Sequence, residues 1–404
     1  MKMVFISGLM CLGASCGDNI QPVAPDATPT TLVRASDVPI DGLSPADVAA
    51  FETGDALFDL PFTPADGLGP VYVRDACGAC HQDGSRGPGL VQKMAEVDAD
   101  GITADPDQSE LPYGHSIRAE LAAGATTPVE PPAGDTNVKV TTRVGPPVFG
   151  RGYIEAVDDN AIVAMAAEEA KRTDGIHGVV AQSPYLSVPN PDTTFENYQT
   201  GQMVIGKFAL KARIGTVDDF VADAFQGDMG LTTPMRPTEL PNPDNLTDDL
   251  KPGVDLDIDH VNEIAFYVRR IAIPERVKLT PQGEKLFDQV ACSACHVPAM
   301  QTRSDYPIAQ LAGIAAPIYS DLLLHDMGPT FADGMVDGGA TSTQWRTAPL
   351  IGERFVKEFM HDGRAATIED AILAHAGEAA NAAAAFSELS PANQQLLLDF
   401  VGAL

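Results

Sequence analysis

Apolar residues near the C-terminus recur at helical spacing between residues 396 and 404. This run follows Ser390-Pro391, and a serine N-cap with proline at the first helical position is a helix-start signal. Thr280-Pro281 repeats the signal and predicts a helix that runs to Cys292. The pattern therefore predicts an opening helix and a closing helix within residues 279–404.

The first half of the chain repeats this plan. Ser44-Pro45 predicts a helix to about Leu60, and apolar positions from Val261 to Ile271 predict a closing helix. Between them lie loops rich in proline and glycine, a strand-like stretch and a helical run (residues 137–144 and 154–171). We therefore expect two domains, over residues 44–276 and 277–404.

A short motif follows each of the two opening helices in the sequence. Residues 77–81 and 292–296 both read C-x-x-C-H, which is the attachment signature of c-type haem. Cysteines at i and i+3 share a helical face and reach two vinyl groups of one porphyrin, while histidine at i+4 can ligate the iron. We expect thioether bonds at Cys77, Cys80, Cys292 and Cys295, with His81 and His296 as iron ligands.

Three other uses of these cysteines fit less well. A disulfide within C-x-x-C closes a small strained loop. A thiol-redox site expects a βαβ context, and a zinc ribbon expects its pairs about 15–20 residues apart. The two pairs here are separated by more than 200 residues.

The N-terminus resembles an export signal. Residues 1–16 contain one lysine, a short apolar stretch and small residues before Cys16, which predicts a lipoprotein signal. An ordinary signal that is cleaved nearby is the alternative. Residues 17–43 are rich in Pro, Asp and Thr and are expected to be a disordered tether. The expected location is the periplasm or cell surface, with a membrane anchor at lipidated Cys16.

Composition narrows the choice of partners. The chain has 26 basic and 56 acidic residues, a net charge of −30, which argues against nucleic-acid binding. A soluble cytochrome or cupredoxin with a basic face would be attracted to such a surface. Acidic residues between Glu96 and Asp107 resemble part of a calcium loop, but the closing glutamate of an EF-hand is missing. A solvated acidic loop is therefore the favoured interpretation, and calcium binding is the alternative.

Several further segments resemble the di-haem oxidoreductase family, also called thiol oxidoreductases, which is related to bacterial di-haem cytochrome c peroxidases. They are Gly152–Ala156, Gly206–Ala212, Tyr319–Gly328, Gln344–Leu350, Met360–Ala365 and His375–Ala379. The resemblance implies a redox enzyme with two facing haem domains. We therefore expect a mainly α fold of two cytochrome c-like domains, the first enlarged by long loops and a small β element.

The sixth ligand of the second haem is expected to be His375. Ile368, Ala371, Ile372 and His375 share one face of the helix predicted over residues 367–376. In the related peroxidases a methionine ligand follows a His-Asp/Asn-Gly motif by fourteen residues. The resemblance places His375 at that position here, so we expect His296 and His375 to ligate one iron, with Met327 the less favoured alternative.

The sequence indicates the distal residues and the sixth ligand of the first haem less clearly. The Trp-Asp-Gly-Arg block that follows the first haem motif in the peroxidases is missing here. Peroxide cleavage needs a group that moves a proton between two oxygens, and Glu155 is the candidate. Its alternative role is a carboxylate near a helix N-terminus. His115 and His177 are candidates for a removable sixth ligand, or are surface loop histidines.

Two residues of the Gln344–Leu350 segment have two interpretations each. Arg346 could pair with a haem propionate, because guanidinium matches carboxylate in a bidentate way. Trp345 could assist electron transfer between the haems or be a buried aromatic anchor.

Two functions remain open. The first is an exported, peroxidase-like di-haem c-type oxidoreductase, in which electrons enter at the C-terminal bis-histidine haem and chemistry occurs at the N-terminal haem. The second is a non-catalytic di-haem electron-transfer protein, in which protein ligands fill both axial positions of both irons.

Overall fold

The computed structural model describes residues 37–82, 90–97, 111, 114–122, 124–131, 133–247, 250–277 and 279–404. The expected signal with Cys16, most of the expected tether and the acidic loop from Asp98 to Asp107 lie outside these residues. The lipid anchor and the calcium site therefore stay predictions. No helix in the described part of the chain has the length and apolar character to cross a membrane.

The described residues form nine α-helices. They are α1 (Pro45–Phe58), α2 (Arg151–Ala156), α3 (Asp159–Glu169), α4 (Val217–Met229), α5 (Ile258–Arg270), α6 (Pro281–Gln289), α7 (Ile368–Ala374), α8 (Ala380–Ser387) and α9 (Pro391–Gly402).

The strands within the described ranges form five two-stranded antiparallel sheets. These pair β1 (Val71–Tyr72) with β3 (Glu120–Leu121), β2 (Leu90–Glu96) with β4 (Val138–Val144), β5 (Gln182–Pro184) with β6 (Met203–Ile205), β7 (Met300–Gln301) with β8 (Ala315–Ala316), and β9 (Leu324–Asp326) with β10 (Gln344–Arg346). The expectation of a mainly α fold is therefore correct only in part, because small sheets occur in both halves of the chain.

Three of the four framing helices begin where the caps predict. The side chains of Ser44, Thr280 and Ser390 each accept a hydrogen bond from a backbone amide three residues later, and proline follows each of them. The predicted closing helix of the first half is α5. The predicted strand over residues 137–144 is β4.

We expected one helical run over residues 154–171. The structure has two helices there, α2 and α3, so the prediction of a continuous helix was wrong. Val157 adopts extended backbone between α2 and α3 and forms a β-bridge with Thr302. Asp158 then caps α3, because its side chain accepts from the Asn160 amide. A distant strand contact overrides the local helical pattern here.

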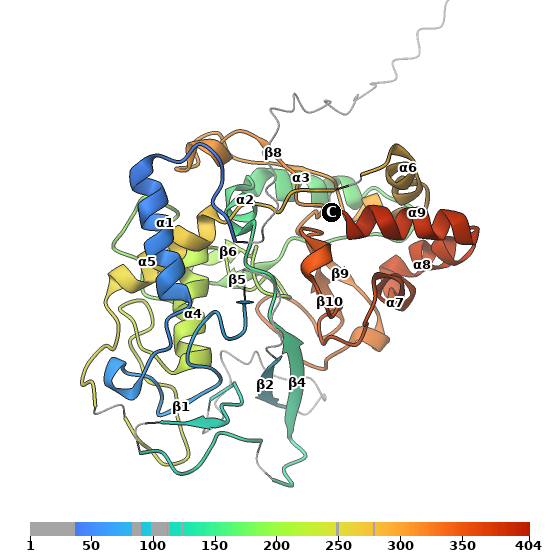
Figure 1. Cartoon of the computed structure of the whole chain (residues 1–404). Coiled ribbons are helices and arrows are strands. Elements are labelled where there is room, and N and C mark those ends of the chain that lie inside the picture. Colours follow the sequence, from blue (N-terminus) through green and yellow to red (C-terminus); the bar gives the residue numbers. More distant parts are fainter. Residues whose placement is uncertain are drawn as a thin grey trace, which may run out of the picture. The chain divides into compact units, whose positions relative to one another are not determined.

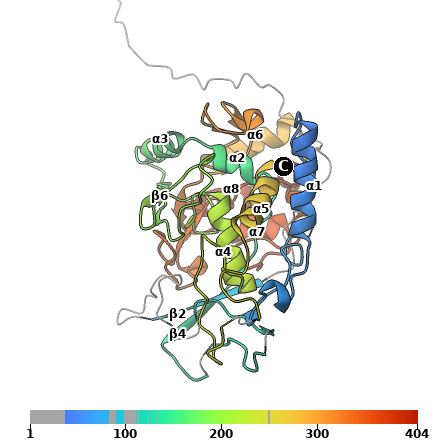
Figure 2. The same ribbon diagram turned by 90° about the vertical axis from the view of Figure 1, so that its left-hand side faces the viewer.

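The opening and closing helices of each half cross closely, α1 against α5 (Figures 1 and 2) and α6 against α9 (Figure 1). Each crossing has a glycine in the opening helix. A Cβ on Gly54 would lie 2.6 Å from Tyr267 Cβ, and one on Gly283 would lie 2.5 Å from Phe400 Cβ. The two helix pairs therefore approach at a distance that only glycine allows.

Two apolar cores accompany these pairs. The larger contains Phe51, Phe225 and Tyr267, and the smaller contains Phe287 and Phe400. The larger core also takes in residues between Met300 and Leu323, from the domain expected over 277–404. The proposed division into two domains at residue 276 stays a prediction.

The end of the expected tether belongs to the fold. Ile40 is buried, and its amide donates to the Arg270 carbonyl at 2.8 Å, while the Ala272 amide donates to Val38 at 2.9 Å. The prediction that residues 17–43 are disordered is therefore wrong for residues 38–40. These residues extend the chain along the end of α5.

Replacing Gly283 by alanine should lower the free energy of unfolding by about 1–3 kcal/mol, because the added methyl overpacks the crossing of α6 and α9. Gly402→Ala in the same helix pair is the control, since its Cβ would lie 3.4 Å from Ile368 Cδ1, an ordinary contact. Denaturant unfolding of both variants tests this. Equal stability of the two variants would contradict the close crossing.

Candidate haem sites

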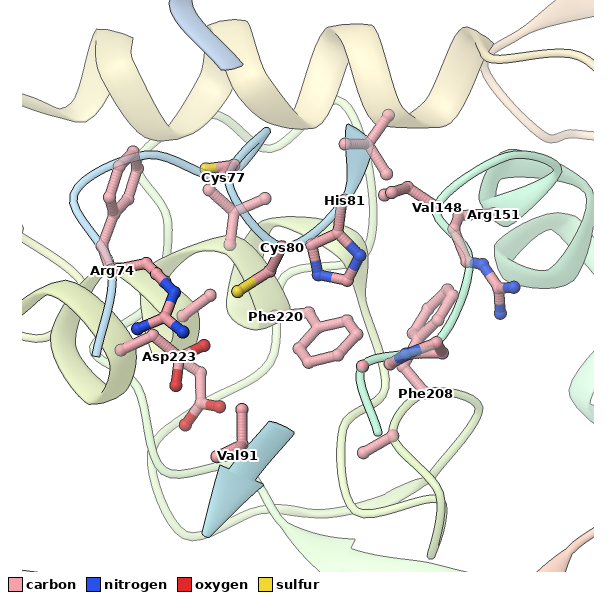
Figure 3. A pocket seen from close by; sticks show the side chains of 18 of the residues that line it. Arg74, Cys77, Cys80, His81, Val91, Val148, Arg151, Phe208, Phe220 and Asp223 are labelled. Carbon is pink, nitrogen blue, oxygen red and sulfur yellow. The ribbon is translucent and has the colours of Figure 1, made fainter. Parts of the chain in front are cut away.

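The first C-x-x-C-H motif forms one wall of a cavity. The amides of Cys80 and His81 donate to the Cys77 carbonyl at 3.1 and 2.9 Å, so the motif makes a tight turn, which follows β1 in the chain. Both sulfurs and the His81 ring line a cavity of about 200 Å³. Figure 3 shows Cys80 and His81 at this pocket with Phe220 and Asp223 from α4 and Val91 from β2.

The lining of this first cavity is mostly apolar and includes several cationic side chains. Aromatic side chains of α1 and α4, with Phe208, supply much of its wall. The lining also contains five basic side chains (Arg74, Lys93, Arg143, Arg151 and Arg213) and two carboxylates (Asp223 and Asp228). An apolar porphyrin that carries two propionates suits such a lining.

The second motif lines a second cavity, of about 250 Å³. The His296 amide donates to the Cys292 carbonyl at 2.9 Å, as His81 does to Cys77. Cys292, Cys295 and His296 all face this cavity, together with His375 from the end of α7. The two motifs therefore occupy equivalent places in two separate cavities.

The His296 and His375 rings face each other, with centroids 6.5 Å apart. Metal–imidazole bonds of about 2 Å on each side of one metal atom give a similar separation of ring centroids. His296 Nδ1 lies 3.2 Å from the Tyr319 carbonyl and His375 Nδ1 lies 2.7 Å from the Ala371 carbonyl, which leaves both Nε2 atoms for a metal. The pair fits one haem iron.

Burial keeps both rings neutral, as metal ligation requires. It lowers the pKa of His296 to about 4, with the neighbouring His375 adding to this effect. Burial also lowers the pKa of His375.

The four motif cysteines form no disulfide with one another. Burial raises the pKa of the Cys77 and Cys292 thiols to about 12. Reactive thiols and zinc ligands have instead a lowered pKa. The buried thiols with raised pKa values therefore favour covalent haem attachment over thiol chemistry.

The two cavities share a wall. Pro146, Pro147, Arg151 and Leu210 line both of them. Two haems held here would lie on either side of a few side chains, which suits electron transfer between them. Arg151, which the sequence analysis did not single out, is the charged residue common to both linings.

The structure places Glu155 away from both cavities. Its carboxylate accepts from Arg269 Nε at 2.6 Å, from Tyr306 Oη at 2.6 Å and from the Val217 amide at 2.7 Å. Burial alone would raise the pKa of Glu155, but the Arg269 guanidinium and these hydrogen bonds lower it. The candidate catalytic residue is thus the ionised half of a buried ion pair, which favours a structural role over the expected acid–base role; catalysis by Glu155 stays an untested prediction.

Asp228 is a residue that the sequence analysis missed. It lies near the end of α4 and lines the first cavity. Within the described ranges its carboxylate takes part in no hydrogen bond or ion pair, whereas that of Asp223 is paired with Arg213. Burial raises the pKa of Asp228 to about 6. The sequence contained a signal for this position. The apolar side chains that line the cavity recur at helical spacing, and Asp228 lies on the same helical face as Val217, Phe220, Val221 and Ala224.

Arg346 lies in the lining of the second cavity and is buried. Its Nε donates to the Ala209 carbonyl at 3.1 Å, and among the described residues no carboxylate forms an ion pair with it. Burial lowers the pKa of Arg346 to about 10. A buried guanidinium with carbonyl partners alone fits the predicted partner of a haem propionate.

Trp345 also lines the second cavity, and cations lie against it. The Lys211 ammonium is 4.1 Å from the indole centroid, and the His361 ring stacks on the indole at 3.9 Å. Because a cation opposes removal of an electron from the indole, this geometry favours the anchor over the electron-transfer role.

The remaining histidine and methionine candidates do not all lie at a cavity. Met327 and His325 line the second cavity, whereas His115 and His177 line neither. His177 Nδ1 lies 3.2 Å from the Glu169 carbonyl instead. Among the described residues that line the first cavity, His81 supplies the one imidazole.

Comparison with known protein families identifies the family of this chain. The model of the family described as "Di-haem oxidoreductase, putative peroxidase" matches residues 128–404. No curated protein matches the chain. The chain therefore belongs to the di-haem oxidoreductase family, whose name implies haem cofactors and redox activity, as the sequence motifs indicated.

Solved structures give weaker similarities. The di-haem peroxidase BthA from Burkholderia thailandensis is 15% identical over 94% of each chain, with a TM-score of 0.40. Hydrazine synthase from Kuenenia stuttgartiensis is 12% identical over 100% of each chain, with a TM-score of 0.39. A MauG-like protein associated with microbial copper homeostasis is 14% identical over 92% of this chain and 93% of that chain, with a TM-score of 0.35. These scores are too low to support any conclusion.

Glu155→Gln should destabilise the fold by about 3–5 kcal/mol, because it leaves the buried Arg269 without its main charge partner. Peroxide reactivity per correctly folded chain should stay unchanged, since Glu155 lines neither cavity. Denaturant unfolding and stopped-flow mixing with peroxide measure the two effects. A wild-type denaturation midpoint together with lost peroxide reactivity would instead support a catalytic role of Glu155.

Proposed function

We propose that this chain is an exported, two-haem c-type peroxidase that reduces a peroxide at the first cavity with electrons received at the second. The supporting observation is the difference between the cavities. One presents two facing imidazoles, and the other presents a single imidazole and a carboxylate without a described partner. A six-coordinate iron suits electron transfer, and an iron with an open side suits chemistry.

The reaction has a simple balance. A hydroperoxide takes up two electrons and two protons and gives an alcohol and water, and hydrogen peroxide gives two waters. When bound, the haems supply the iron sites that hold the oxygen ligand and pass the electrons. The chain itself has to bind the haems, keep bulk water out and move a proton.

Asp228 is the group that we assign to proton movement in the first cavity. Its carboxylate faces a mostly apolar space, and the charged groups that act on it are Lys93, Asp223 and Arg213. A carboxylate with a pKa near 6 can accept a proton from bound peroxide near neutral pH and return it to the leaving oxygen. The Asp228 carbonyl also accepts from the amides of Val73 and Arg74, which fixes this end of α4 beside the first motif.

The non-catalytic alternative has one observation in its favour. Met229 and Lys93 also line the first cavity, and either could supply a sixth ligand to the first iron. In that case the ferric protein would contain two low-spin haems and would not turn over peroxide.

The donor and location follow from the sequence. A net charge of −30 favours a soluble cytochrome or cupredoxin with a basic docking face. An export signal and lipidated Cys16 would hold the enzyme at a membrane surface in the periplasm or on the cell exterior. The proposed peroxidase function requires haem attachment through Cys77, Cys80, Cys292 and Cys295.

Asp228→Asn should lower the second-order rate constant for the reaction of the reduced protein with hydrogen peroxide by about 100-fold or more, because proton transfer contributes about 10²–10⁴-fold. Asp305→Asn removes the same charge from a side chain that is 83% exposed and should have no effect. Stopped-flow absorbance measures both. A wild-type protein inert to peroxide would refute the proposed function, and an Asp228→Asn variant as fast as wild type would refute this role of Asp228.

The same rate constant should depend on pH. Asp228 is protonated below a pH of about 6 and ionised above it, so the wild-type rate should rise as the pH increases through about 6. The rise should disappear in Asp228→Asn. A rise that persists in the variant would assign the titration to another group.

A further inference from the structure

A cluster of buried charges lies beside the second cavity. His325, on β9, has its Nδ1 2.8 Å from Glu378 Oε2 and its Nε2 3.0 Å from Asp321 Oδ2. Glu169 Oε2 is 3.9 Å from the same Nε2, and Cys295 Sγ is 3.9 Å from Nδ1. The side chains of His325, Asp321 and Glu169 are at most 4% exposed.

The cluster holds a charged imidazole. Each ring nitrogen lies within hydrogen-bond distance of a carboxylate oxygen, so both nitrogens donate and the ring is an imidazolium. Although burial opposes the charged form, the hydrogen bonds with Asp321 and Glu378 raise the pKa of His325. The interaction between His325 and Glu378 is therefore an ion pair, and both residues also line the second cavity. Charge-assisted hydrogen bonds of this kind are stronger than neutral ones.

Glu378 is held from three directions. Besides His325, the His177 amide donates to its carboxylate at 2.9 Å and the Asp326 amide donates at 3.1 Å. A single side chain thus joins three segments that are far apart in the sequence. These partners fix the position of the short 3₁₀ turn Gly377–Ala379 that carries Glu378.

This turn follows directly after the candidate ligand His375. His375 ends α7, with a backbone conformation that leaves the helix, and the chain then enters the turn. Gly377 has a φ of +57°, and a Cβ there would lie 2.1 Å from the Asp326 carbonyl oxygen. The backbone of the ligand segment is therefore pressed against the end of β9.

The other contact of His375 does not fix this position by itself. Its Nδ1 lies 2.7 Å from the Ala371 carbonyl of its own helix. That contact orients the ring within α7. The helix itself packs against α8 and α9, where Ile368 and Ile372 join the smaller core. The described contacts of the ligand segment with the end of β9 are made through Glu378 and Gly377.

We propose that the ion pair between Glu378 and His325 is a latch that holds the His375 segment against β9 and so keeps the His375 imidazole opposite His296. Glu378 is a positioning residue that acts through His375. The inference rests on the proposed bis-histidine haem in the second cavity and identifies what maintains it. When the latch is absent, the segment can withdraw, and the second iron becomes accessible to an added ligand.

The latch is tested by replacing Glu378 with alanine in the full-length holoprotein. The loss of a charge-assisted hydrogen bond shifts an equilibrium by about tenfold or more. We expect the fraction of the second haem that binds carbon monoxide after reduction to rise at least tenfold, with a weaker low-spin ferric signal in electron paramagnetic resonance. Glu369→Ala is the matched control, because Glu369 is exposed in the first turn of α7.

A second variant guards against misfolding. Glu378→Gln keeps the shape and the acceptor oxygen but removes the charge, so it should give an intermediate increase in carbon monoxide binding. A wild-type-like signal and wild-type-like binding in both variants would overturn the latch while leaving the proposed function intact. A wild-type protein without any bis-histidine signal would instead refute the ligation on which the latch rests.

Discussion

The buried ion pair between Glu155 and Arg269 is the contact on which the placement of both cavities depends. It joins α2 to α5, and Arg269 also donates to Asp218 of α4 at 3.0 Å. Other side chains of these three helices line the first cavity, and Arg151 of α2 lines both. Because an unpaired charge at this depth is costly, the three helices are held in one arrangement.

Three buried or partly buried carboxylates near the cavities have different surroundings. Glu155 is ionised and structural. Asp228 has no described partner, faces an apolar cavity and suits proton transfer. Glu378 pairs with an imidazolium and positions a ligand segment. The environment of each carboxylate, rather than its residue type, separates the three roles.

The local features of the fold could be predicted from the sequence, whereas its distant contacts could not. Caps such as Thr280 act within a few residues, so the framing helices were predictable. The helical face shared by Ile372 and His375 also led to the facing imidazoles. The buried ion pair of Glu155 could not be predicted, because its partner Arg269 is 114 positions away. The 53 positions between His325 and Glu378 hid the latch in the same way.

The central claim is that the two irons differ in ligation. Near-infrared magnetic circular dichroism of the ferric holoprotein measures this directly. The account predicts one bis-histidine low-spin band, which is lost in His375→Ala, together with a high-spin signal from the first haem. Two low-spin haems with no high-spin component, or a spectrum without a bis-histidine band, would contradict it.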